Sequence, residues 1–370
     1  MKILIEDVSI LTMSTRYEGL IGRGYIFINN GLIRSIGPGS PPEDLEIPDI
    51  VIGGKGKLAI PGLIALFSRL AIYPFRGILG RGIKGVGEIV NNMSSNDLQL
   101  ISTISLAALA VRGITAIVSV DRYVEPIVRA AENVGLRVIA APCLEKGFDR
   151  DEWSREISSS ARKWHRKDSS SILVTGSICS ESAVRGDELS IVPSDMPLIV
   201  YGDACRRLRG NRILYVDPLP ECGVKSDLSI YTEDHMDLWQ PGSGYGIYRD
   251  LSWSLTRHFT IARARGFNPL DILGSATIWA SNKVGLYTGV IEPGRFSDIV
   301  IIDISQPPWW IPERLINEVA AADIVVSGYP RIETVIVGNE IVVDNGELLT
   351  VGREIFSKAY NRVAELLGRR

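Results

Sequence analysis

Apolar segments and helical stretches alternate through the middle of the chain, and this alternation constrains the fold more than any other feature. Residues 114–120 are continuously apolar, as strands buried on both faces of a parallel sheet are. Including one that begins at Leu63, seven such segments follow one another, the others lying at 136–141, 172–175, 198–201, 212–216 and 228–231. Strands that alternate with helices predict an α/β fold of parallel βα units and, by their number, a (β/α)8 barrel of the TIM type.

The second half of this barrel is expected to be abridged. A complete barrel needs eight strands, and the pattern supplies seven. Connections after residue 180 are also short, because only about ten residues separate Asp203 from Arg212, and a full crossover with its helix takes at least about ten to twelve. The second half is therefore trimmed, or one strand is irregular.

Both ends of the chain have the pattern of β-structure. Residues 25–28 and 32–36 are short apolar segments, and the intervening Asn30-Gly31 tolerates the positive φ angles of a tight hairpin. Alternating segments return at 298–303 and 332–343. The pattern predicts a composite β-sandwich from residues 1–60 and 286–352, a barrel from 61–285, and a closing helix within 353–370.

Composition excludes several classes of protein. A net charge of −3 gives no general attraction to nucleic acid or to an anionic membrane. No uninterrupted apolar run reaches the roughly 18–20 residues of a membrane span, and an acidic pair at Glu6-Asp7 interrupts any signal peptide. A cytoplasmic protein is expected. Its four cysteines lack Cys-x-x-Cys spacing and are expected to be buried thiols, namely Cys143, Cys179, Cys205 and Cys222.

Four segments together resemble a known family. They are Leu58-Ala59-Ile60-Pro61-Gly62-Leu63-Ile64, the segment 107–115 that ends in Arg112-Gly113-Ile114-Thr115, the segment 289–300 (GVIEPGRFSDIV), and the segment 333–339 (ETVIVGN). The chain is similar over nearly its whole length to the cyclic amidohydrolases of the amidohydrolase superfamily. That group includes triazine chlorohydrolases, deaminases of adenosine derivatives and guanine deaminase. These segments are signatures of the fold and carry no information about chemistry.

The resemblance implies a metal site whose histidines this chain does not supply. In the family, a His-x-His pair on strand 1, one histidine each on strands 5 and 6, and an aspartate after strand 8 bind the metal, and a glutamate moves protons. This chain has three histidines in all, which is too few for that set. Phe67 and Arg69 stand at the strand 1 ligand positions and Tyr201 at that of strand 5, where Ala204, with Asp203 beside it, replaces the glutamate. On strand 6 the family's Ala-His-Cys becomes Tyr215-Val216-Asp217, and Glu233 matches the aspartate after strand 8. Cys179 lies in the strand 4 segment that replaces the substrate-contacting Pro-His-x-Pro of the family.

Two functions follow from this comparison. The favoured one is an amidohydrolase-like protein with an eroded metal site that binds a small molecule or a partner, hydrolyses nothing and needs no cofactor. In it, Arg69 takes the place of the metal and holds the remaining carboxylates, or recruits an anionic ligand. The alternative is a hydrolase or deaminase of non-peptide C–N bonds in cyclic amidines or purine-like substrates, with a rebuilt site and zinc or iron.

The candidate residues lie where predicted strands end, because active sites of barrels lie at the carboxyl ends of the strands. Carboxylates there either bind a hard cation or pair with neighbouring arginines. The partner is expected to be a small anionic or heterocyclic ligand, with a homodimer as the default assembly. The catalytic candidates are Asp203, Glu233 and His235, and the ligand-binding candidates are Arg69, Phe67, Glu145, Cys179, Tyr201 and Asp217.

Overall fold

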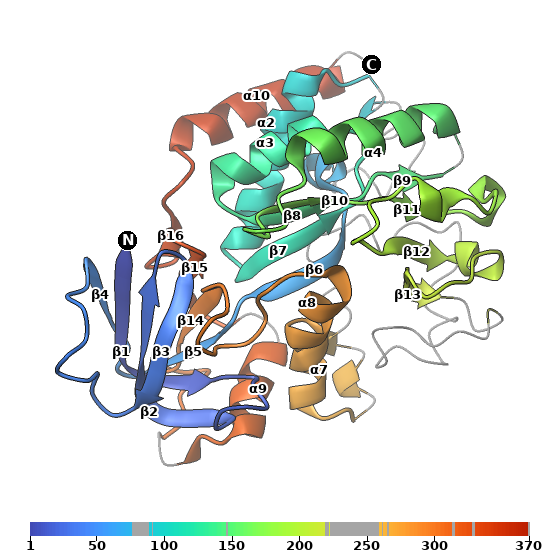
Figure 1. Ribbon diagram of the computed structural model, residues 1–370. Coiled ribbons are helices and arrows are strands. Elements are labelled where there is room, and N and C mark those ends of the chain that lie inside the picture. Colours follow the sequence, from blue (N-terminus) through green and yellow to red (C-terminus); the bar gives the residue numbers. More distant parts are fainter. Residues whose placement is uncertain are drawn as a thin grey trace.

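The computed structural model has a mixed α/β fold in which a β-sheet made from both chain ends adjoins a layer of parallel strands (Figure 1). It describes residues 1–75, 89–90, 92–145, 147–218, 222, 259–260, 262–264, 266–312, 315–327 and 330–368. Within these ranges no helix is long and apolar enough to cross a membrane. The predicted fold class is confirmed, although the described strands form an open surface and not a closed barrel.

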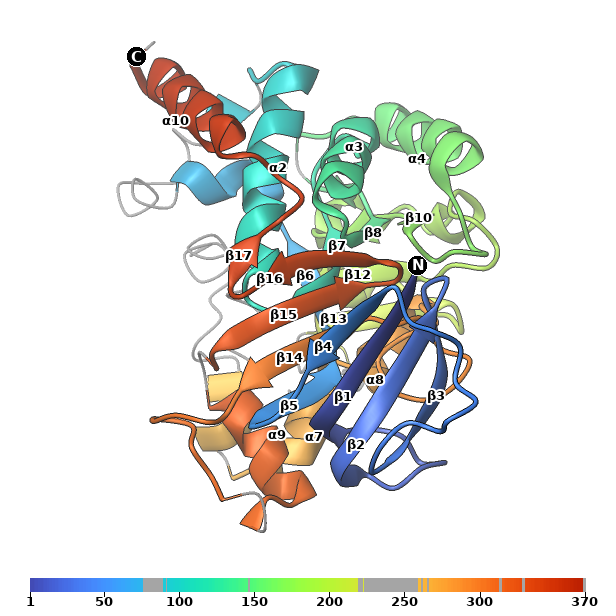
Figure 2. The same cartoon turned by 90° about the vertical axis from the view of Figure 1, so that its left-hand side faces the viewer.

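The nine-stranded sheet is composite, as predicted (Figure 2). Its order is β17-β16-β15-β14-β5-β1-β2-β3, with β4 beside β1. The two chain ends join where β5 pairs antiparallel with β14, Pro61 lying opposite Ile299. Asn30 and Gly31 have φ angles of 52° and 74°, which explains the hairpin between β2 and β3. The strands are β1 Lys2–Leu11, β2 Leu20–Asn29, β3 Leu32–Pro38, β4 Ile50–Gly53, β5 Lys57–Pro61, β14 Ile299–Asp303, β15 Ile332–Val337, β16 Glu340–Asp344 and β17 Glu347–Leu348.

The parallel strands form two four-stranded sheets, ordered β10-β8-β7-β6 and β13-β12-β11-β9. Six of the seven predicted strands are present, and the seventh, at 228–231, lies outside the described residues. The elements are β6 Leu63–Ser68, β7 Ile114–Ser119, β8 Arg137–Ala140, β9 Cys143–Leu144, β10 Ile172–Val174, β11 Ser177–Ile178, β12 Leu198–Gly202 and β13 Ile213–Pro218.

These two sheets are continuous with each other. Val138 lies opposite Ile172 and Cys143 opposite Ser177, so the register is the same before and after the interruption. The amide of Ser177 donates to the carbonyl of Pro142 (3.0 Å), which continues the ladder across it. Because proline has no N–H, the ladder is interrupted there. Thus β8 with β9, and β10 with β11, are two interrupted strands within one six-stranded parallel surface.

Helices cover one face of the first half of this surface (Figure 1). They are α2 Ser95–Ala110, α3 Val124–Val134 and α4 Arg150–Trp164. In the described chain between β11 and β13, only short 3₁₀ helices connect the strands, η3 Glu181–Ala183, η4 Glu188–Ser190 and η5 Asp203–Arg206. The connections are therefore abridged there, as expected. Other helices within the described residues are η1 Leu70–Phe75, α7 Pro269–Ser275, α8 Ile278–Val284, α9 Glu318–Val326 and α10 Arg353–Gly368.

Three of the segments that carry the family resemblance contact one another where the composite nine-stranded sheet meets the parallel strands. The amide of Gly62 donates to the backbone carbonyl of Asp298 (2.8 Å). A Cβ atom on Gly62 would lie 2.1 Å from Oγ1 of Thr115, so only glycine fits there. The Asp298 carboxylate is fully buried and accepts two hydrogen bonds from Arg137, at 2.6 and 2.9 Å. The residues of these segments therefore form the junction between the composite sheet and the parallel strands.

The four cysteines form two disulfides, so the prediction of buried thiols is wrong. Cys143 pairs with Cys179, and Cys205 pairs with Cys222. Cys143 begins β9 and Cys179 directly follows the neighbouring strand β11, with 5.8 Å between their Cα atoms. Their separation of 36 residues in sequence gives no sign of this proximity, because strand pairing creates it.

An ion pair attaches helix α10 to the start of α2. Arg362 donates two hydrogen bonds to Asp97 (2.6 and 2.9 Å), while the Asp97 side chain also closes a capping box with Ser94. Chiefly because of the hydrogen bond from Arg362, the pKa of Asp97 is lowered from 3.8 to about 2.

We therefore expect acid to weaken this attachment. A carboxylate whose pKa is lower in the folded protein stabilises the fold above its unfolded pKa, and that contribution is lost as the pH falls through the folded pKa. The loss, on the order of 1–2 kcal/mol, should occur between pH 3.8 and about pH 2. Denaturant unfolding of the wild type and of Asp97→Asn across this range measures it. If the free energies of unfolding of the wild type and of Asp97→Asn differed by the same amount at every pH, the stabilising role given to the ionised Asp97 would be contradicted.

Candidate functional site

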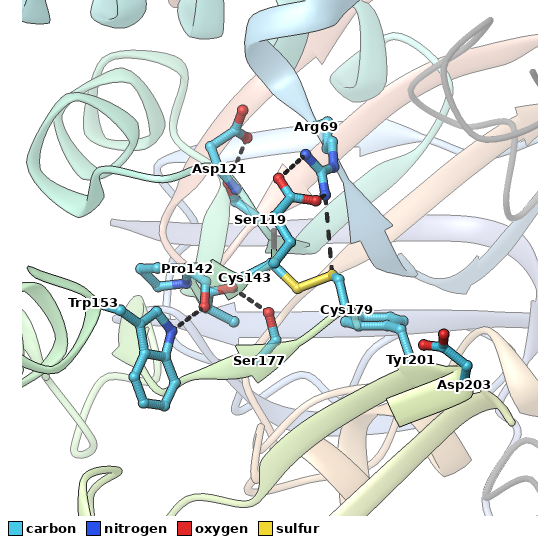
Figure 3. The surroundings of a disulfide bond; sticks show 12 residues. Arg69, Ser119, Asp121, Pro142, Cys143, Trp153, Ser177, Cys179, Tyr201 and Asp203 are labelled. Carbon is cyan, nitrogen blue, oxygen red and sulfur yellow. Dashed lines mark hydrogen bonds and ion pairs between the residues drawn. A yellow bond between two sulfur atoms is a disulfide. The ribbon is translucent and has the colours of Figure 1, made fainter. Parts of the chain in front are cut away.

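The described candidate residues gather at the carboxyl ends of the parallel strands (Figure 3). Because these strands run in the same direction, their carboxyl ends share one edge of the sheet, where parallel α/β folds place their ligands. Beneath this edge lies an apolar layer formed by inward-facing residues of the strands, against which Phe67 and Cys179 pack. The edge brings together Phe67 and Arg69 (at the end of β6), Asp121 (after β7), Glu145 (after β9), Cys179 (after β11), and Tyr201 with Asp203 (at the end of β12).

A two-pronged ion pair joins the ends of β6 and β9. Arg69 donates from Nη1 to Oε1 of Glu145 (2.8 Å) and from Nη2 to Oε2 (2.7 Å). The Arg69 side chain is 16% exposed and that of Glu145 is 40% exposed. A bidentate arginine–carboxylate pair of this kind fixes the orientation of both side chains. Because the two side chains are partly exposed, the pair contributes only up to about 1 kcal/mol to stability. Its main effect is to define the geometry and the charge of the edge.

Asp121 fastens the turn that follows β6. Its carboxylate accepts hydrogen bonds from the amides of Leu70 (2.8 Å) and Ala71 (3.1 Å) and from the hydroxyl of Ser119 (2.8 Å). Burial raises the pKa of Asp121, while these hydrogen bonds and the charge of Arg69 oppose the rise. With three donors around it, Asp121 positions the backbone next to Arg69.

Tyr201 and Phe67 close the apolar layer beside the ion pair. Their rings meet edge to face, with 5.0 Å between the ring centroids. The Tyr201 hydroxyl donates to the carbonyl of Leu66 (2.7 Å), which links the end of β12 to β6. Tyr201 is 5% exposed, so its observed contacts are those of packing within the protein.

Asp203 begins the short helix η5 and accepts a hydrogen bond from the amide of Glu181 (3.0 Å). Glu181 in turn pairs with Arg206 and Arg207, each at 3.1 Å. One of the roughly four acceptor positions of the Asp203 carboxylate is thus occupied by a backbone amide. The group is held in a fixed place at the end of a strand.

Some candidates are not brought to this edge by the described structure. Glu233 and His235 lie outside the described residues, as does the side chain of Asp217. His165 is not one of the candidates; it ends helix α4, where its Nδ1 accepts from the amide of Val174 and its Nε2 lies 3.2 Å from Oδ2 of Asp195. The sequence prediction missed the disulfide beside Arg69 and the role of Glu181, because neither residue spacing nor composition indicates them.

The described part of the edge does not fit a metal ion. Among the described residues, no group of three or more His, Cys, Asp or Glu side chains is arranged to hold one. The cysteines are in disulfides, and the guanidinium of Arg69 cannot act as a ligand. We therefore assign no chemical step to a metal.

Curated relatives of the chain are named as deaminases. The 5'-deoxyadenosine deaminase of Methanothermobacter thermautotrophicus is 22% identical over 95% of this chain and 96% of its own. The 5-methylthioadenosine/S-adenosylhomocysteine deaminase of Thermoanaerobacter pseudethanolicus is 23% identical over 96% of each chain. No family model matches the chain. The similarity to these two proteins therefore extends over nearly the whole length of each.

Solved structures of similar fold contain zinc. An adenosine deaminase from Xanthomonas campestris with bound zinc covers 99% of this chain, with 98% of its own chain matched, a TM-score of 0.79 and 14% identity. Atrazine chlorohydrolase from Arthrobacter aurescens TC1, complexed with zinc, covers 97% of this chain, with 99% of its own matched, a TM-score of 0.73 and 16% identity. At these identities the likeness describes the fold.

Two expectations are corrected by these findings. The favoured prediction of a non-hydrolytic binding or partner protein is contradicted, because the relatives that span the chain are named as deaminases. The expectation that no cofactor is needed is contradicted by the zinc in structures of the same fold. Both predictions rested on the number of histidines, which tests for one particular ligand set only. Sequence and fold together support the resemblance of the chain to the amidohydrolase superfamily.

Proposed function

We propose that the protein is a hydrolase that cleaves a non-peptide C–N bond of a purine-like or cyclic amidine substrate and releases ammonia or an amine. The observation that carries this proposal is the similarity, along 95% of the chain, to a deaminase of an adenosine derivative. The polar edge of the parallel strands supports it, because Arg69, Glu145 and Asp203 gather where this fold class carries its chemistry.

The reaction needs a base that takes a proton from water and an acid that returns one to the leaving nitrogen. Asp203 is the described carboxylate that we assign to this proton transfer, since the amide of Glu181 fixes its position. Glu145 accepts a hydrogen bond from the exocyclic amino group of the substrate with the lone pairs that Arg69 leaves unused. Arg69 holds the Glu145 side chain in place. In this scheme the ion pair orients the substrate and Asp203 moves the proton.

Ammonia release tests the proposal. Purified protein should release ammonia from 5'-deoxyadenosine, 5-methylthioadenosine or S-adenosylhomocysteine, assayed as isolated and after addition of zinc or iron, with the metal content measured by elemental analysis. Asp203→Asn should lower kcat by at least about 10²-fold, the smallest contribution usual for a general acid or base. A matched control is Asp195→Asn, a carboxylate paired with Lys167 and His165 away from this edge. Absence of release from every substrate under all metal conditions would refute the proposal.

A further inference from the structure

The two disulfides of this protein differ in access. Cys205 is 0% exposed and Cys222 is 4% exposed, so both sulfur atoms of that bond are buried. In the other bond Cys143 is 2% exposed, whereas Cys179 is only partly buried and lies at the polar edge of the parallel strands (Figure 3). Among the four cysteines only Cys179 is more than slightly exposed, so the Cys143–Cys179 bond is the more accessible of the two to a thiol from solution.

The charges around the two bonds also differ. Nη2 of Arg69 lies 4.0 Å from Sγ of Cys179, and the Arg69 side chain is held in this position by its two-pronged pairing with Glu145. Sγ of Cys205 lies instead 2.8 Å from the carbonyl oxygen of Gly202. A guanidinium stabilises a thiolate, and a carbonyl oxygen destabilises one. Only the Cys179 sulfur is placed for thiol chemistry.

We propose that Cys143–Cys179 is a thiol–disulfide exchange site, at which a low-molecular-weight thiol attacks Cys179 and Arg69 stabilises the Cys179 thiolate. This proposal is independent of the proposed hydrolytic function. It assigns a chemical role to the disulfide and a further role to Arg69. The Cys205–Cys222 bond has a structural role only.

The exchange balances in two steps. The thiolate of the reductant attacks Sγ of Cys179, a mixed disulfide forms, and the electron pair of the broken bond leaves on Cys143, which takes a proton from solvent. A second thiolate attacks the outer sulfur of the mixed disulfide and releases Cys179 as a thiolate beside Arg69. Two thiols are thereby oxidised to their disulfide, and the protein pair gains two electrons.

Selective reduction tests the site. Full-length protein purified without reductant is incubated with increasing ratios of reduced to oxidised glutathione, quenched with acid, alkylated and analysed by peptide mass spectrometry. Cys143 and Cys179 should be labelled at ratios that leave Cys205 and Cys222 unlabelled, and the glutathione adduct should be on Cys179. Simultaneous reduction of both bonds, or an adduct on Cys143, would overturn the proposal.

Charge variants test the role of Arg69. In the reduced protein, Arg69→Met should raise the pH midpoint of Cys179 alkylation by about one unit, which is about tenfold less thiolate near neutral pH. Glu145→Gln should lower the midpoint, because it removes a negative charge beside the thiolate, and Arg69→Lys should leave it close to that of the wild type. Shifts of the same sign in Arg69→Met and Glu145→Gln would indicate a structural disturbance and refute the role. Should Arg69→Met fail to fold, the other two variants still decide.

Discussion

Replacement of Arg137 by methionine should lower the free energy of unfolding by about 3–5 kcal/mol, because it leaves a buried carboxylate without its counter-charge. The Arg137 side chain is 5% exposed and that of Asp298 is 0% exposed. Arg137 also donates to the carbonyl of Ser169 (2.7 Å), and its guanidinium lies 4.6 Å from the centroid of the Phe296 ring. The contacts with Asp298 and Phe296 join the parallel strands to the segment that leads into the composite sheet, and the contact with Ser169 lies within the parallel part. One substitution therefore removes several contacts together.

Urea or guanidinium unfolding measures this effect. The double variant Arg137→Met/Asp298→Asn should lose less than the sum of the two single variants, because the second change removes the uncompensated charge. Arg129→Met is the matched control, since Arg129 pairs with Glu125 on the surface of α3 with 49% and 42% of their side chains exposed. Its cost should stay below about 1 kcal/mol. If Arg137→Met and Arg129→Met lowered the free energy of unfolding equally, the buried Arg137–Asp298 pair would not have the stabilising role given to it here.

Removal of the Cys205–Cys222 bond should cost about 3 kcal/mol, because the unfolded chain regains the freedom of the loop that the bond closes. This loop spans 17 residues of sequence. Within this loop the described residues contain the end of the short helix η5 and strand β13. For the 36-residue separation of Cys143–Cys179, the same relation gives about 4 kcal/mol.

The double variant Cys205→Ser/Cys222→Ser measures this cost by denaturant unfolding without reductant. The control is a strong reductant that breaks both bonds, in which the wild type and the variant should unfold at nearly the same denaturant concentration. A variant that unfolds together with the oxidised wild type would show that the bond does not contribute to stability.

Much of the fold was predictable because apolar patterning reports strands directly. Continuously apolar segments mark strands with two buried faces, and every residue of β7 is indeed buried. Asn30-Gly31 marks a hairpin because few other residues adopt its φ angles. These signals are local, and each is complete within a few neighbouring residues.

The site was predictable only in part, because its contacts are not local. That Arg69 meets Glu145 depends on two strands ending at the same edge, which the sequence does indicate. That Cys143 meets Cys179 depends on the register of β9 with β11, which no spacing in the sequence reveals. The number of histidines misled the prediction of function, since it measures one ligand set and says nothing about the carboxylates or about the relatives of the chain.

The antiparallel pairing of β5 with β14 determines when this protein is able to complete its folding during synthesis. Strand β5, which ends at Pro61, pairs with β14, which begins at Ile299. One edge of β5 therefore stays unpaired until most of the chain has left the ribosome. Contacts between residues so far apart form slowly, and an exposed strand edge invites association with other chains in the meantime. We therefore expect chains truncated before β14 to aggregate, whereas addition of the missing C-terminal strands as a separate peptide should keep them in solution.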